Sequence, residues 1–208
     1  MKRLYLLRHG QTEFNVKKLV QGRCDSPLTD LGRKQAGMAA AWLKGHDVVP
    51  DKVVSSPLGR AMDTASLVAT ELLGPDAAVE PCEGIIERSY GTFEEGPHDA
   101  LPTDVWDPGE DLVPFGGEGS HALQERMVST LAYLMSAEDV ETLLAVSHGS
   151  ASRQFIKAAA PEGFELPTKL PNCAIMIFDF EEERSGEEGD APQSKFILQQ
   201  IIDPQQSN

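Results

Sequence analysis

Two histidines of the 208-residue chain stand directly after apolar runs, His9 within LLRHGQTEFN and His148 within AVSHGSASR. Two arginines accompany them, Arg8 beside the first histidine and Arg60 within SSPLGR. Guanidinium groups match phosphate oxygens in bidentate fashion, and a neutral imidazole nitrogen is a competent nucleophile near neutral pH. Residues of these types indicate a site that binds a phosphoryl group and can react with it.

Three predicted strand–loop–helix units must position these side chains. Buried strands are expected at Arg3–Leu7, Lys52–Ser55 and Thr142–Val146, because each is a short apolar run that ends where polar residues begin. The carboxyl ends of parallel strands meet at one edge of a sheet, where loops and helix N-termini form ligand sites. We therefore expect the polar residues that follow the three strands to lie at that edge.

The neighbouring helices are predicted from capping residues and from the spacing of apolar side chains. Thr29 is a suitable N-cap for a helix that runs to about Lys44. Pro57 can occupy the first turn of a second helix, which continues to about Leu73. The apolar faces are predicted from Leu31, Met38 and Trp42 in the first helix and from Leu123, Met127, Leu131 and Leu134 in a helix before the third strand.

Near the C-terminus, two strand-like runs, Ala174–Phe180 and Lys195–Ile202, flank an acidic stretch that contains Gly and Pro. They predict a hairpin at an edge of the sheet, with the acidic loop 181–190 in solvent and its role open. The alternation of strands and helices elsewhere predicts an α/β three-layer sandwich with a mainly parallel central sheet. The length fits a single domain over residues 1–208.

Composition and charge exclude several classes of function. The formal net charge is −15 and no cluster of Lys or Arg offsets it, so we expect neither nucleic acid nor a membrane as a partner. Three cysteines without CxxC or Cys/His spacing indicate neither a disulfide framework nor a zinc site. The apolar run Leu4–Leu7 is too short for a signal peptide, and no stretch reaches membrane-spanning length. These observations favour a cytoplasmic protein.

Taken together, the motifs resemble those of the histidine phosphatase superfamily, the phosphoglycerate mutase-like enzymes. The resemblance runs from Lys2 to about Phe180 and rests on RHGQTEFN, QGRCDSPLTDLGRKQA, SSPLGRAMDTA, ERSYGTFEEG and the segment around His148. It implies a phosphoglycerate mutase-like fold with a lid inserted at about residues 89–120. It also implies phosphoryl transfer without a metal or cofactor, because arginines and histidines supply the positive charge that the transition state needs.

The resemblance assigns roles to the candidate residues. It makes His9 the nucleophile that becomes phosphorylated, and Glu87 the acid that protonates the leaving group and later takes a proton from water. Arg8, Arg60 and His148 would bind the transferring oxygens and stabilise their charge. The remaining phosphate-binding positions are Asn15, Gln21, Gly22 and Gly149.

Such a site could hydrolyse a phosphate ester or return the phosphoryl group to a second hydroxyl. For a mutase, the segment ERSYG at 87–91 resembles one whose Arg and Tyr help to bind phosphoglycerate. Against it, residues 89–125, which should cover the site, hold nine Asp or Glu and no Lys or Arg, and long basic insertions typical of mutases are lacking. A bisphosphate needs further cations in addition to the arginines that bind the transferring phosphoryl group. The sequence thus favours a metal-independent histidine acid-type phosphatase acting on a small phosphorylated metabolite.

Two alternatives to hydrolysis stay open, mutase-type phosphotransfer and a non-catalytic phospho-ligand binder. A binder would not need both a nucleophile and an acid. The segment GGEGS at 116–120 has one more glycine than the usual GGES of the family, and its role is open. His46, His98 and His121 lie outside every motif and are expected at exposed positions away from the site. The physiological substrate is also open, as is a homodimer.

Overall fold

The computed structural model describes residues 1–160, 164–183 and 193–206. Six strands form one sheet in the order β3-β2-β4-β1-β5-β6. Neighbours from β3 to β1 run parallel, whereas β5 pairs antiparallel with β1 and with β6. The predicted mainly parallel sheet with a C-terminal edge hairpin is therefore confirmed. The strands are β1 (Lys2–Arg8), β2 (Lys52–Ser55), β3 (Glu80–Pro81), β4 (Thr142–Ser147), β5 (Ile175–Glu183) and β6 (Gln193–Ile202).

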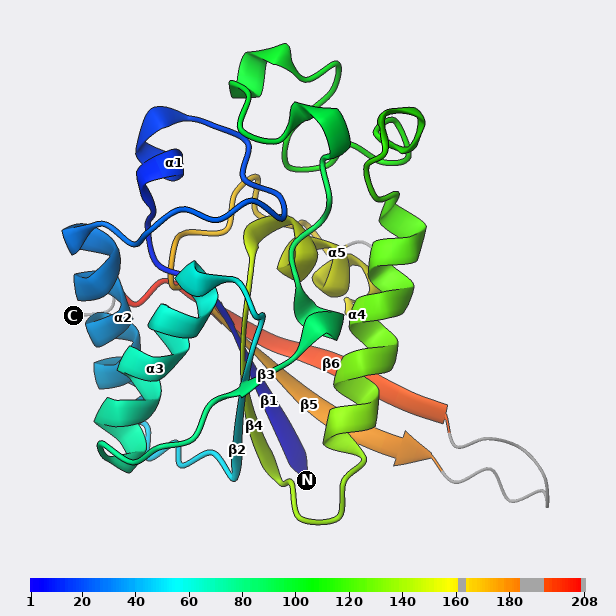
Figure 1. The fold of residues 1–208 in the computed structure, drawn as a ribbon. Helices are drawn as coiled ribbons and strands as arrows, with labels where there is room; N and C mark the ends of the chain where they lie inside the picture. Colours follow the sequence, from blue (N-terminus) through cyan, green and yellow to red (C-terminus); the bar gives the residue numbers. More distant parts are fainter. Residues whose placement is uncertain (161–163, 184–192, 207–208) are drawn as a thin grey trace.

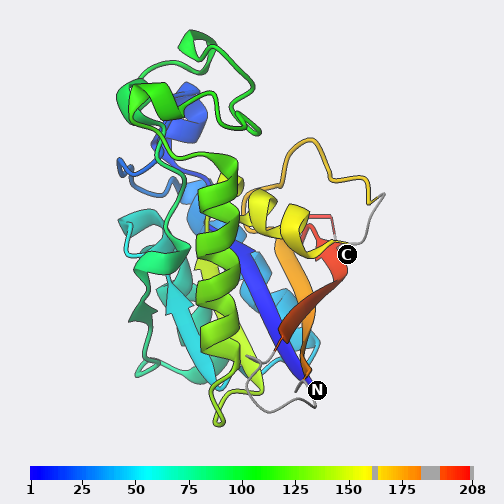
Figure 2. The same ribbon diagram turned by 90° about the vertical axis from the view of Figure 1, so that its right-hand side faces the viewer.

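Helices cover both faces of the sheet, as the two views in Figures 1 and 2 show. One layer contains α2 and α3 and the other contains α4 and α5, which completes the predicted three-layer arrangement. None of the described helices is long and apolar enough to cross a membrane. The helices are α1 (Glu13–Lys17), α2 (Asp30–Gly45), α3 (Gly59–Leu73), α4 (Ser120–Met135) and α5 (Gly149–Ala159), with single 3₁₀ turns at Glu83–Ile85, Gly91–Phe93, His98–Ala100 and Val113–Phe115.

The central strand β1 divides the hydrophobic core between the two layers, because successive side chains of a strand point to opposite faces. Leu4 and Leu6 belong to the cluster under α4 and α5. Tyr5 and Leu7 belong to the cluster under α2 and α3. Both faces of β1 are thus buried, which explains why its sequence shows no polar alternation.

Two details of the predicted helices were wrong. In α2, Leu31 and Met38 are exposed, and the buried face holds the small residues Ala36, Ala39 and Ala40 together with Leu43. The alanines pack in one cluster with buried alanines of α3. Pro57 precedes α3, which begins at Gly59.

The predicted apolar face of α4 is confirmed. Leu123, Met127 and Leu131 are fully buried, and Leu134 is partly buried and packs against the same core.

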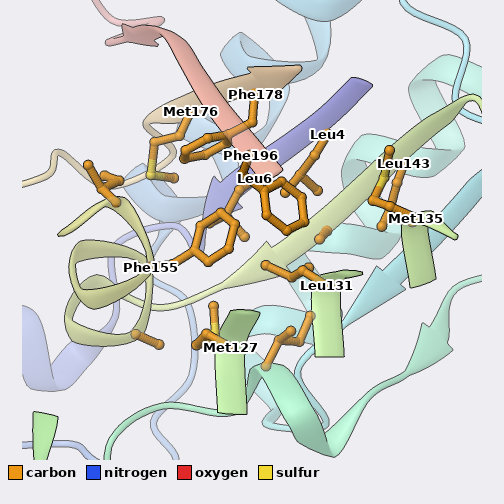
Figure 3. Close-up of a cluster of buried hydrophobic side chains, with 14 of the residues drawn as sticks. Leu4, Leu6, Met127, Leu131, Met135, Leu143, Phe155, Met176, Phe178 and Phe196 are labelled. Atoms are coloured by element: carbon orange, nitrogen blue, oxygen red, sulfur yellow. The ribbon is translucent and has the colours of Figure 1, made fainter. Parts of the chain in front are cut away.

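The C-terminal hairpin continues further than predicted. Residues 181–183 of the acidic stretch extend β5, and the rest of the predicted loop, 184–190, lies outside the described residues. The described part of β6 brings Phe196 against Phe155 of α5 and Phe178 of β5, with ring centroids 4.9 and 6.3 Å away (Figure 3). This aromatic group joins the hairpin to the α4/α5 layer.

Replacing Phe178 by Ala tests the contribution of that aromatic group. Phe178 is fully buried, so the lost burial and the remaining cavity should lower the free energy of unfolding by about 3–5 kcal/mol. Tyr133→Ala is the control, because Tyr133 is 81% exposed on α4 and its removal should change stability by less than about 0.5 kcal/mol. Urea denaturation of both variants measures the difference, and equal losses would contradict the assignment.

Candidate active site

The predicted chemical groups meet at the carboxyl edge of the parallel strands. Arg8 is the last residue of β1 and His9 follows it, while His148 follows β4 and caps α5. Arg8 lies directly opposite the end of β4 in the sheet register. Arg60 lies in the first turn of α3, after β2. In Figure 1 the green segment that follows Glu87 stands above this edge.

A cavity with a volume of about 60 Å³ opens at this edge, which is small compared with typical ligand pockets of roughly 300–1,000 Å³. Every predicted site residue except His148 lines it: Arg8, His9, Asn15, Gln21, Gly22, Arg60, Glu87 and Gly149. His148 is fully buried behind His9, with the two ring centroids 5.2 Å apart. The sequence motifs therefore come together in one place.

His9 is held as a neutral imidazole with a defined tautomer. Its Nδ1 lies 2.7 Å from the carbonyl oxygen of Gly10. Because a carbonyl can only accept, Nδ1 carries the proton and Nε2 keeps its lone pair. Burial, and then the charges of Arg60 and Arg8, hold the pKa of His9 well below its usual value. His9 thus has the unprotonated nitrogen that a nucleophile needs.

His148 also stays neutral, and one of its ring nitrogens has no partner. Burial, then the charge of Arg60, lowers its pKa well below the usual value. The hydroxyl of Ser56 lies 2.6 Å from His148 Nε2 and donates or accepts there according to the tautomer of the ring. Nδ1 is buried and has no hydrogen-bond partner within the described part of the chain. A buried polar nitrogen without a partner is costly, so Nδ1 is a candidate for contact with a bound ligand.

Arg8 and Arg60 bring two buried positive charges to the site. Arg60 donates to the carbonyl oxygens of Cys24 and Gly22, each at 2.7 Å, and to Asp25 Oδ1 at 3.0 Å. Arg8 donates to the carbonyl oxygen of Leu170. Burial lowers the pKa of Arg8 to about 10, so it remains positive at neutral pH. The Nε atoms of both arginines are buried without a partner in the described residues, and an anion can accept from them.

Glu87 is fixed by the N-terminus of α5. Its carboxylate accepts from the backbone N–H groups of Ala151 at 2.8 Å and Ser150 at 3.2 Å, and also from that of Arg88 at 2.8 Å. Its side chain is almost fully buried and lines the cavity opposite the strand ends. This position allows the carboxyl group to exchange a proton with a group bound beside His9.

Asn15 and Gln21 present amide nitrogens to the cavity. Asn15 Oδ1 accepts from the backbone N–H of Thr12 at 3.1 Å and from Asn172 Nδ2 at 3.2 Å, which leaves its amide nitrogen available. Gln21 Oε1 accepts from the Thr12 hydroxyl at 3.0 Å. Asn172 also donates to the carbonyl oxygen of His9 at 3.1 Å. Asn172 was not predicted, and it connects the backbone at His9 to the side chain of Asn15.

The rest of the cavity lining consists of residues that were not assigned to the site from sequence. They include His98, which is half-buried rather than exposed, so its predicted exposed position outside the site was wrong. His46 and His121 are exposed as predicted. Tyr90 of the ERSYG segment and Ser150 of the His148 motif also line the cavity, together with Leu19, Val20, Val105 and Trp106, which lie outside every motif.

The carboxylates of the lid do not face the cavity, although residues 89–125 are rich in them. Glu94 accepts from the backbone N–H of Tyr90 at 2.9 Å, and Asp107 pairs with Lys157 of α5. Glu118 forms a two-pronged pair with Arg126 of α4, at 2.8 and 2.9 Å. Within residues 89–125, all of which the structure describes, no Asp or Glu lines the cavity. Direct repulsion of a substrate by these lid acids is therefore not supported.

Arg88 points away from the cavity. It is fully buried and donates to Ser150 Oγ and Ser120 Oγ, and to the carbonyl oxygens of Gly109 and Glu118. Its guanidinium therefore holds the lid rather than a ligand. This arrangement removes the arginine from the argument that the segment at 87–91 offered for a phosphoglycerate site, whereas Tyr90 of the same segment lines the cavity.

The segment at 116–120 closes the lid onto α4. Gly116 adopts a left-handed φ of 78°, which favours glycine. The backbone N–H of Glu118 donates to the carbonyl oxygen of Ser89 at 2.8 Å, which ties the two ends of the lid together. Gly119 then provides the N-cap of α4. The extra glycine thus lies where the chain turns into a helix.

Comparison with known proteins agrees with this geometry. A model of the histidine phosphatase superfamily (branch 1) matches residues 4–188 of the chain. The probable phosphoglycerate mutase GpmB of Escherichia fergusonii is 32% identical over 193 residues, which cover 88% of this chain and 87% of that protein.

Solved structures share the fold over nearly the whole chain. A mutant of the phosphoserine phosphatase of Entamoeba histolytica, in complex with phosphoserine, is 28% identical with a TM-score of 0.74, over 99% of this chain and 98% of that one. A mycobacterial glucosyl-3-phosphoglycerate phosphatase is 24% identical with a TM-score of 0.73, over 95% of this chain and 98% of that one, and this likeness shows the fold alone.

The protonation of the two site histidines can be measured directly. An imidazole with the ordinary pKa of 6.5 is mostly charged at pH 6, but His9 and His148 should be neutral there because burial and the nearby arginines disfavour their charged forms. Ring nitrogen chemical shifts measure this state, and His9→Asn and His148→Asn variants assign the signals. Charged rings at pH 6 would contradict the electrostatic account.

The lowered pKa values of His9 and His148 also predict how the stability of the fold depends on pH. Below pH 6.5 the unfolded chain binds protons on these two imidazoles that the folded chain does not. The free energy of unfolding should therefore fall as the pH goes below this value, and the His148→Asn variant should lose less stability than the wild type over the same interval.

Proposed function

The chain belongs to the histidine phosphatase superfamily, and from this premise we propose that it is a phosphomonoesterase. It hydrolyses a small phosphorylated metabolite through a phosphohistidine on His9, with Glu87 as the proton donor. Neither a metal nor a cofactor takes part in the proposed reaction, since the arginines and histidines supply the positive charge.

One observation carries the proposal. The hydrogen bond from His9 Nδ1 to Gly10 leaves Nε2 unprotonated beside Arg8 and Arg60, in a cavity that Glu87 also lines. A nucleophile, two phosphate-binding cations and a carboxyl group are the set that covalent phosphoryl transfer requires. A non-catalytic binder would need only the cations.

In the first step, His9 Nε2 attacks phosphorus and the bond from phosphorus to the ester oxygen breaks. Glu87 gives its proton to that oxygen, so the product leaves as an alcohol. Arg8 and Arg60 offer their Nε donors to the equatorial oxygens, where the charge of the transition state is spread. In the tautomer that accepts from the Ser56 hydroxyl, His148 Nδ1 carries a proton and supplies another donor.

In the second step, water attacks the phosphorus of phosphohistidine and the bond from phosphorus to Nε2 breaks. The Glu87 carboxylate takes the proton from the attacking water, which returns it to its starting state. Inorganic phosphate and neutral His9 are the products, so one ester and one water yield one alcohol and one phosphate. The same carboxyl group serves both steps because it stays anchored to α5.

Hydrolysis is favoured over transfer to a second hydroxyl by the placement of cations. Arg88 is bonded to the lid, and the lining of the cavity includes no Lys and no Arg besides Arg8 and Arg60 among the described residues. A second phosphate or carboxylate would therefore lack a partner there. The name of the Escherichia fergusonii relative keeps mutase-type transfer as the second candidate.

Separate substitutions of His9 and Glu87 distinguish their proposed roles. His9→Ala should abolish turnover and covalent labelling by phosphate, because the nucleophile is gone. Glu87→Gln keeps the size of the side chain but cannot deliver a proton, so turnover of alkyl esters should fall roughly 10²- to 10⁴-fold. Aryl esters should lose less, because their leaving groups need the acid least. Acid-quench experiments followed by mapping of the labelled residue measure both effects.

The control for these variants is Tyr133→Ala, because Tyr133 is 81% exposed on α4 and lies outside the cavity lining, so this variant should keep wild-type turnover. All assays contain excess chelator. If activity is lost in chelator and a divalent ion restores it, this result would contradict a metal-independent mechanism. Label on a residue other than His9, or equal losses for alkyl and aryl esters in Glu87→Gln, would also rule it out.

Phosphotransfer is tested with 3-phosphoglycerate and catalytic amounts of 2,3-bisphosphoglycerate. Because the cavity offers cations only at its phosphoryl end, we expect release of inorganic phosphate to exceed formation of 2-phosphoglycerate by at least about tenfold. Phosphorus NMR of the reaction mixture measures both products in one sample. Efficient isomerisation that depends on the bisphosphate would instead establish the mutase.

A further inference from the structure

The lining of the cavity contains two chemically different groups of residues. One group comprises the two arginines, His9 and Glu87, and we call it the phosphoryl side. The other group is mainly apolar or aromatic, and we call it the leaving-group side, or wall: Leu19, Val20, Tyr90, His98, Val105 and Trp106. Of these, only Tyr90 and His98 can titrate.

Both titratable groups on this side are neutral near pH 7. The Tyr90 hydroxyl donates to the carbonyl oxygen of Val105 at 2.7 Å, and burial raises the pKa of Tyr90. His98 Nε2 lies 3.2 Å from the carbonyl oxygen of Leu19, so Nε2 carries the proton, and burial lowers the pKa of His98. His98 Nδ1 therefore remains as an acceptor. The leaving-group side therefore carries no formal charge, and His98 Nδ1 is an uncharged hydrogen-bond acceptor on it.

Trp106 is the largest part of this wall and is fixed in place. Its ring lies over the guanidinium of Arg8, 5.1 Å from Arg8 Cζ to the ring centroid. A Cβ atom at Gly149 would lie 2.9 Å from the indole, so the ring packs closely on the start of α5. The next residue, Asp107, accepts from Gln154 Nε2 at 2.9 Å and pairs with Lys157, both on α5. The ring thus packs beside Arg8 and Gly149, and Asp107 anchors the adjoining backbone to α5.

We propose that Trp106 determines specificity for the leaving group, and that the substrates are phosphate monoesters of small uncharged alcohols with apolar or aromatic carbon. This inference rests on the proposed function. A leaving group of this kind gains from burial against Trp106 and Val105. A carboxylate in the same place loses its hydration and finds no cation. A hydroxyl on the leaving group can donate to His98 Nδ1.

Binding of phosphonates tests the proposed role of Trp106 without hydrolysis, because a phosphonate has a carbon–phosphorus bond in place of the ester bond that a phosphatase breaks. Benzylphosphonate carries an aromatic group and phosphonoacetate carries a carboxylate. Calorimetric titration of the wild type should show benzylphosphonate binding at least about tenfold more tightly. In Trp106→Ala this preference should fall to about twofold or less, whereas Trp106→Phe, which keeps an aromatic wall, should retain most of it.

The chain has two tryptophans, and the second supplies the matched control. Trp42 stacks on His46 at 3.8 Å between ring centroids and does not line the cavity. Trp42→Phe should keep the wild-type preference, and it leaves Trp106 as the only tryptophan, so its fluorescence should change with benzylphosphonate. Tighter binding of phosphonoacetate, or an unchanged preference in Trp106→Ala, would overturn the inference.

Hydrolysis of 4-nitrophenyl phosphate is measured in parallel and separates the two proposals. Hydrolysis without a preference among the phosphonates overturns the leaving-group wall and leaves the phosphatase standing. A preference that depends on Trp106, without hydrolysis of any monoester, supports the wall and contradicts the phosphatase.

Discussion

Two buried guanidinium groups are the feature on which the site depends. Arg8 and Arg60 remain positive in the interior, because carbonyl oxygens accept from them and Glu87 and Asp25 offset their charge. Their field, added to burial, keeps His9 in its neutral form. In the proposed mechanism, the charge that binds the phosphoryl group therefore also keeps the nucleophile unprotonated. A site with fewer cations would bind phosphate less well and would leave the imidazole easier to protonate.

The adjacent residues Glu87 and Arg88 connect the proposed proton donor to the lid. The carboxylate of Glu87 is anchored at the N-terminus of α5, where the partial positive charge of the helix favours an acidic group. The guanidinium of Arg88 is bonded to Gly109, Glu118 and Ser120, three points on the lid and at the start of α4. Since neighbouring residues share a backbone, movement of the lid at these points would disturb the position of the acid.

The phosphoryl side of the site could be predicted from sequence, and the leaving-group side could not. His9 and His148 follow apolar strands directly, so local pattern and motif were sufficient to place them at one edge of the sheet. His98 and Trp106 lie in irregular segments, and their positions depend on partners distant in the chain. His98 contacts Leu19, 79 residues away, and the segment of Trp106 is held through Asp107. The local spacing of residue types along the chain does not indicate contacts between residues so distant in sequence.

The acidity of the lid illustrates why charge composition did not predict the character of the cavity. Asp107 and Glu118 of the lid are paired with Lys157 and Arg126 on the two helices beneath it. These partly buried pairs hold the lid against the two helices. The lid carboxylates therefore contribute to the position of the lid, and none of them lines the cavity. On the inference drawn above, the uncharged residues around Trp106, rather than the net charge of the lid, would select among esters.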